Sequence, residues 1–148
     1  MSKVSVEGKW VGKLSYGRGY PAEYRAKSLC FVINILATND LVKGDCDDDI
    51  TKELLLKPAS IEGTYKNKSI HFIKRYPCLV TFDEKENLKA IPTEPSPDIQ
   101  YNGRLHRKFF SGKKYFKGDW KISVSFLDGN GLAQYYTLGG NWMMEKAS

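Results

Sequence analysis

The stretch Phe116-Lys-Gly-Asp-Trp-Lys-Ile-Ser-Val-Ser-Phe126 decides the fold class of this chain. Its even-numbered positions hold apolar residues or glycine, whereas its odd-numbered positions hold lysine, aspartate and serine. Strict alternation over this length is the period of a β-strand with one buried face and one solvent face. The segment therefore predicts a strand whose inner face carries Phe116, Trp120 and Phe126.

The same alternation continues outward to both ends of the chain. It covers residues 4–16 and 132–144, and shorter strands are expected at 29–37, 41–46, 60–66, 69–76, 78–82 and 98–106. Turn-forming residues at 38–40 and 66–68 separate neighbouring strands, and three prolines make 91–97 a loop or an irregular edge. No window has a convincing helical period. We expect one all-β domain over residues 1–148.

A repeated glycine pattern narrows the architecture. An apolar residue, any residue, glycine, any residue and a second apolar residue recur around Gly8, Gly44, Gly63, Gly103, Gly118 and Gly140. Each glycine shares the parity of the buried residues, and glycine inside a strand marks a bend or a close approach. Strong coiling of sequential antiparallel strands predicts an up-and-down β-barrel of about eight to ten strands. In it, large inward residues such as Trp10, Trp120 and Trp142 are expected to lie over the glycines.

Composition limits the functional classes. The chain of 148 residues has a net charge of +6, and no apolar run is long enough for a membrane span or a signal peptide. Three cysteines, Cys30, Cys46 and Cys78, are too few and too scattered for a disulfide framework. These features favour a cytoplasmic protein with reduced thiols.

The first and last strands resemble those of calycin barrels, the group of lipocalins, fatty-acid-binding proteins and avidins. Gly8-Lys9-Trp10 is similar to the Gly-x-Trp that opens those barrels, and Trp142 followed by Lys146 is similar to their closing strand. The resemblance implies a barrel that holds a small ligand. The segments at residues 16–21, 72–77 and 95–97 also look like parts of bacterial proteins of unassigned function, which implies a bacterial source.

The chain departs from the fatty-acid-binding branch in two places. Its last strand reads Gly-Gly-Asn-Trp-Met-Met and lacks the Arg-x-Tyr pair that holds a carboxylate in that branch. Residues 17–28 contain Gly17, Gly19 and Pro21, so they do not match the helical lid. A fatty-acid chaperone is therefore not expected.

The predicted interior suggests a ligand site. Inward glycines leave volume, and tyrosine hydroxyls supply the few polar contacts that a pocket needs. Both parities of the strand at 69–76 carry a basic residue near its end, and Arg107 shares the parity of inward residues, so a basic group is expected near the interior. We predict an interior or mouth pocket lined by some of Tyr65, Phe72, Arg75, Tyr101, Arg107, Trp120 and Tyr136.

Other chemistry finds less support in the sequence. Seven lysines and arginines between Arg104 and Lys121 alternate with aromatics, but a solvated hairpin explains them better than nucleic-acid binding. The acidic run at 45–49 lacks the spacing of an EF-hand, and we expect a hairpin turn there. His71 and His106 have no nucleophile in a motif context. We expect no catalytic residue, no metal, no cofactor, and neither a nucleic acid nor a membrane as partner.

Two functional hypotheses remain open. The first is a non-enzymatic binder of an apolar or aromatic ligand with one acidic or hydrogen-bonding end. The second is a protein–protein interaction module with a filled barrel, whose rim loops are 16–24, rich in tyrosine and glycine, and 82–97, rich in proline. The interior volume of the barrel distinguishes them, because a ligand needs a cavity of several hundred cubic ångströms, roughly 300–1,000 Å³.

Overall fold

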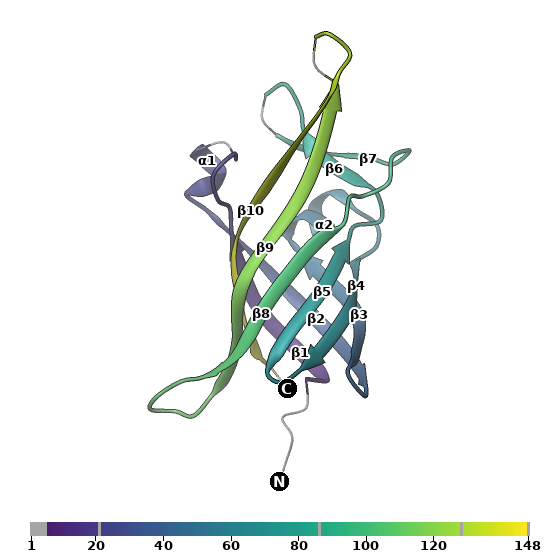
Figure 1. Cartoon of the computed structure of the whole chain (residues 1–148). Helices are drawn as coiled ribbons and strands as arrows, with labels where there is room; N and C mark the ends of the chain where they lie inside the picture. The colour runs from purple at the N-terminus through teal and green to yellow at the C-terminus, as the bar shows by residue number, and fades with distance from the viewer. Residues whose placement is uncertain (1–5, 21, 86, 128, 148) are drawn as a thin grey trace.

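The computed structural model describes residues 6–20, 22–85, 87–127 and 129–147, and within them eight antiparallel strands form a closed barrel (Figure 1). Their order around the barrel is β1-β10-β9-β8-β5-β4-β3-β2. The strands are β1 (Gly8–Ser15), β2 (Ser28–Thr38), β3 (Leu41–Asp48), β4 (Ala59–Lys66), β5 (Ser69–Arg75), β8 (Ile99–Arg107), β9 (Lys114–Leu127) and β10 (Ala133–Lys146). Pairing of β1 with β10 closes the barrel, so the all-β, up-and-down prediction is confirmed.

Three further elements gather at one end of the barrel, which we call the mouth (Figure 1). They are the helices α1 (Ala22–Arg25) and α2 (Asp49–Leu54) and the two-stranded sheet of β6 (Leu79–Phe82) and β7 (Leu88–Ile91). The helices and β7 were not predicted, because four to six residues are too few to show a period. No helix in the described part of the chain is both long and apolar enough to cross a bilayer.

The predicted strand boundaries agree with the structure to within a few residues, apart from the acidic run. Asn39 and Asn67 adopt positive φ angles of 57° and 52°, as tight hairpin turns require. The expectation of a hairpin turn at residues 45–49 is wrong. Asp45, Asp47 and Asp48 belong to β3, and Asp49 begins α2. The alternation pattern did not predict the end of β3, because aspartate occupies both faces of the strand there.

The inward glycines let neighbouring strands approach closely. A Cβ at Gly118 would overlap the carbonyl oxygen of Asn102 on β8, and a Cβ at Gly103 would lie 2.5 Å from the indole of Trp142. The Trp142 indole lies over Gly103, as expected, and donates from Nε1 to the carbonyl oxygen of Asp119 at 2.8 Å. These glycines therefore make room for strand backbone and tryptophan.

Aromatic side chains fill the described part of the interior. Trp10 packs against Phe116 with ring centroids 5.0 Å apart, and both are fully buried. Phe72 stacks on Tyr101 at 4.8 Å, and Trp142 lies edge-on to both rings. The predicted inward positions Phe126 and Tyr136 lie in strands, but their side chains are outside the described residues, as are residues 4–5 of the predicted first strand.

Candidate functional site

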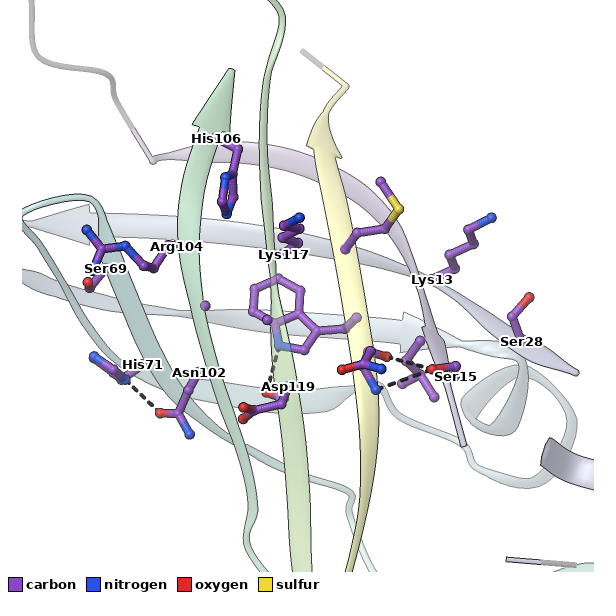
Figure 2. A pocket seen from close by; sticks show the side chains of 16 residues that line it. Lys13, Ser15, Ser28, Ser69, His71, Asn102, Arg104, His106, Lys117 and Asp119 are labelled. Atoms are coloured by element: carbon purple, nitrogen blue, oxygen red, sulfur yellow. Dashed lines mark hydrogen bonds between the residues drawn. The ribbon is translucent and has the colours of Figure 1, made fainter. Parts of the chain in front are cut away.

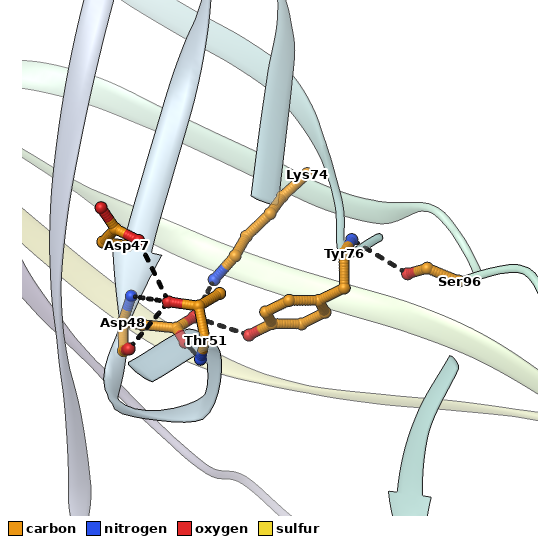
Figure 3. Close-up of polar contacts among 6 residues, drawn as sticks. All are labelled: Asp47, Asp48, Thr51, Lys74, Tyr76 and Ser96. Atoms are coloured by element: carbon orange, nitrogen blue, oxygen red, sulfur yellow. Dashed lines mark hydrogen bonds and ion pairs between the residues drawn. The ribbon is translucent and has the colours of Figure 1, made fainter. Parts of the chain in front are cut away.

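A buried ion pair lies inside the barrel near the mouth. The Lys74 ammonium on β5 contacts the carboxylate of Asp48, the last residue of β3, with 2.6 Å between Nζ and Oδ2 (Figure 3). Both side chains are almost completely buried. A buried charge is tolerated when it is paired and hydrogen-bonded. Lys74 is thus the inward basic residue that the sequence required on this strand.

The Asp48 carboxylate is held from three directions. Tyr76 donates its hydroxyl to Oδ2 at 2.7 Å, on the same oxygen that meets Lys74. The other oxygen accepts the backbone N–H of Thr51 at 2.9 Å, and the Thr51 hydroxyl accepts the backbone N–H of Asp48, which completes a capping box. Asp48 therefore starts helix α2 and anchors the lysine (Figure 3).

The ammonium of Lys74 has further polar neighbours. It interacts electrostatically with the Cys46 thiol and the Tyr101 hydroxyl, and it lies 4.7 Å from the centroid of the Tyr76 ring and 5.9 Å from that of the Tyr101 ring. No buried side-chain nitrogen or oxygen lacks a hydrogen-bond partner in the described residues. A ligand that reached this network would have to displace an existing partner, so we assign the ion pair to stabilising the fold and not to binding a ligand.

Burial and electrostatic contacts keep Lys74, Cys46 and Tyr16 protonated. Burial acts to lower the pKa of Lys74, but the polar neighbours outweigh it and raise that pKa well above its ordinary value. Burial raises the pKa of the Cys46 thiol to about 11 and, together with Asp48, that of the Tyr16 hydroxyl to about 12. The thiol and the hydroxyl remain neutral donors at physiological pH, so neither is an activated nucleophile.

Four aromatic residues cover the interior at the mouth. Tyr16, just after β1, lies 4.9 Å from Tyr20, 5.8 Å from Tyr24 and 5.9 Å from Trp120, measured between ring centroids. Trp120 also donates its indole N–H to the backbone oxygen of Ser15 at 2.9 Å. The tyrosines of segment 16–24 therefore pack against one another instead of projecting separately into solvent.

A cavity of about 370 Å³ opens beside this cluster, and we call it the mouth pocket. Its walls come from segment 16–29, helix α2 and strand β7, so side chains face it from several elements. The apolar lining consists of Leu29, Ile50, Leu54 and Leu88, with Tyr16 and Tyr24 adding hydroxyls and Lys27, Ser28, Asp49, Glu53 and Asn87 adding polar groups. The cavity falls in the size range of small-molecule sites, roughly 300–1,000 Å³.

The predicted site residues are only partly brought together. Phe72, Tyr101 and Trp120 are buried in the interior, and Tyr65 on β4 contacts Phe116 at 5.6 Å lower in the same core. None of these four is among the residues that line the mouth pocket.

The two predicted arginines do not join them. Arg75 lies on the outer surface, where its Nε is 2.5 Å from Asp98, and this contact raises the pKa of Arg75 and lowers that of Asp98. Arg107 is exposed at the end of β8 away from the mouth. The side chain of Tyr136 is outside the described residues.

A larger groove of about 880 Å³ runs across the outer face of the barrel. Figure 2 shows its lining on β5, β8, β9, β10, β1 and the start of β2, which includes Lys13, Arg104, Lys117 and Asp119. His71 contacts Asn102 at 2.6 Å between Nδ1 and Oδ1 within it. The groove lies along one side of a single sheet, so it encloses a ligand less than the mouth pocket does.

The sequence contained two signals for this region. An inward basic residue on the strand at 69–76 was predicted, but neither its identity nor its partner was, because Asp48 is brought beside Lys74 only by the pairing of β3 and β5 with β4. The Asp48-x-x-Thr51 spacing was the available sign of a helix start. Comparison with known proteins adds nothing, since no family model, no curated protein and no solved structure matches the chain.

Proposed function

We propose that this protein is a non-enzymatic binder of a small, largely apolar or aromatic molecule, held in the mouth pocket of a calycin-like barrel. The observation that carries the proposal is the mouth pocket itself, with aliphatic and tyrosine walls from several elements. Such a site gains affinity from apolar burial and orientation from a few hydroxyl and amide groups. The closed eight-stranded barrel supports the calycin-like assignment.

The charges of the lining define the ligand further. The charge of Lys27 is paired with Glu23, with 3.3 Å between Nζ and Oε1. Asp49 and Glu53 contribute two carboxylates to the pocket lining. A neutral or cationic polar end is therefore favoured here over an anionic one. The acidic end expected from the sequence depended on Arg75 and Arg107, and neither lines this pocket.

A thermal-shift screen of flavonoids, tetrapyrroles, nucleotides and fatty acids tests the proposal. A ligand that binds only the folded protein raises its melting temperature. Leu54→Glu places a charge in the pocket wall and should abolish the shift. Leu56→Glu is the matched control, because Leu56 is fully exposed nearby and outside the lining, so it should leave the shift intact.

The competing function is a protein–protein interaction module, supported by the aromatic packing of the described interior. Native mass spectrometry of protein purified from its own host separates the two. A retained small-molecule adduct, lost in Leu54→Glu, supports the binder. A retained protein partner, with no compound shifting the melting temperature, would support the module and overturn the binder.

A further inference from the structure

Two adjacent phenylalanines project from the end of the barrel opposite the mouth. Phe109 and Phe110 occupy the connection between β8 and β9, which extends away from the barrel (Figure 1). Their side chains are 91% and 97% exposed, and their rings meet edge to face with centroids 4.9 Å apart. A surface apolar residue is ordinary, but two neighbouring aromatics this exposed form an unpartnered apolar tip.

The loop that presents them is ordered by other residues. The Lys108 N–H donates to the backbone oxygen of Lys113 at 2.8 Å, and the Gly112 N–H donates to that of Lys108 at 2.9 Å. Gly112 has a φ of 67°, the left-handed conformation that glycine adopts without strain. The phenyl rings are therefore not needed to shape the loop, and their exposure requires another explanation.

Cations surround the stem directly behind the tip. Residues 104–117 contain six lysines and arginines and no acidic residue. Arg107 is paired with Lys114 across the two strands. Glu145 on β10 contacts both Lys108 and Lys113, which ties the loop to the barrel and offsets only part of this charge. The result is an apolar tip followed by a positive collar.

We propose that the loop of residues 107–114, which carries the apolar tip Phe109 and Phe110, docks the protein on the surface of an anionic lipid bilayer. The phenyl rings would enter the boundary between headgroups and acyl chains, while the collar remains at the level of the headgroups. Charge complementarity selects an anionic surface. A nucleic acid suits the tip less well, because two rings at 90° to each other cannot both stack on successive, roughly parallel bases.

This contact is independent of the mouth pocket. The loop between β8 and β9 and the mouth lie at opposite ends of the barrel (Figure 1). A protein docked on a membrane through this loop would therefore keep its mouth pocket accessible from solvent. The sequence led to the opposite expectation, namely no membrane partner, because the alternation that assigned Phe116 to the core gives no prediction for Phe109 and Phe110.

Vesicle co-sedimentation tests the docking with the full chain. Vesicles of phosphatidylcholine mixed with phosphatidylglycerol should bind the protein, and vesicles of phosphatidylcholine alone should bind it much less. Binding should fall sharply in ~1 M salt, where the Debye length is ~3 Å. The double variant Phe109→Ser/Phe110→Ser should weaken binding at least ~10-fold, and Arg107→Gln or Lys114→Gln about fivefold each.

A matched control is Leu56→Ser/Leu132→Ser, which removes two exposed apolar side chains elsewhere and should bind like wild type. Unchanged melting temperatures would show that all variants fold. The proposal is overturned if anionic vesicles do not bind the protein, or if the phenylalanine variant binds equally well. It is also overturned if a single-stranded oligonucleotide, or a second copy in sedimentation velocity, occupies the tip while vesicles do not.

Discussion

Removal of the Lys74 ammonium should be among the most destabilising single changes in this protein. Lys74→Met keeps most of the side-chain volume but leaves the Asp48 carboxylate buried with only Tyr76 and the Thr51 N–H as partners. Breaking a buried ion pair on one side costs about 3–5 kcal/mol. For a chain of this size, that loss lowers the melting temperature by roughly 6–20 °C.

A double-mutant cycle separates the ion pair from packing. Asp48→Asn/Lys74→Met removes both charges, and the asparagine oxygen can still accept the Thr51 N–H and so preserve the helix cap. The double variant should therefore lose less stability than the two single losses added together, by about 0.5–3 kcal/mol.

Urea unfolding followed by tryptophan fluorescence gives the four free energies of unfolding in the cycle. Unchanged m-values would show that the compactness of the unfolded state is the same in all four proteins. Two results would refute the reasoning. One is a loss within ~0.5 kcal/mol for Lys74→Met, as at an ordinary surface site. The other is strictly additive losses, which would mean that the two charges do not interact.

Three further outcomes are expected. Gly118→Val should lower the melting temperature strongly, because its Cβ would meet the β8 backbone. Gly129→Val should not, because no atom of the described residues lies within 4 Å of a Cβ there; equal effects of the two changes would contradict the close approach of β8 and β9 at Gly118. A disulfide reagent should modify the exposed Cys30 quickly and the buried Cys46 only on unfolding, and fast labelling of both would be inconsistent with the burial. The free energy of unfolding should be constant at neutral pH and fall from about pH 9 upward. The folded state keeps protons on Cys46 (pKa about 11, ordinarily 9.0) and Tyr16 (pKa about 12, ordinarily 10.0), whereas the unfolded chain releases them. Unfolding followed by circular dichroism at alkaline pH measures this, and a free energy of unfolding that rises there would contradict it.

The barrel was predictable because the sequence patterns that indicate it each extend over only a few neighbouring residues. Alternation over residues 116–126, glycines at inward positions and tight turns at Asn39 and Asn67 act through the backbone within a few residues. Closure of β1 on β10 followed from the need to bury the inner face of every strand. The helices escaped because a single turn carries no period, and Asp48 looked like part of an acidic turn until its burial was known.

The sequence by itself determined the strands, their inward faces and the demand for one basic residue inside the barrel. Tertiary structure alone decided which residue that is, what neutralises it and where a cavity remains. Lys74 and Asp48 are far apart in the chain, and strand register brings their side chains together across β4. The exposure of Phe109 and Phe110 was likewise decided by tertiary structure. The sequence pattern predicts which residues share a face, but only the packing of the folded chain determines which apolar residues remain uncovered.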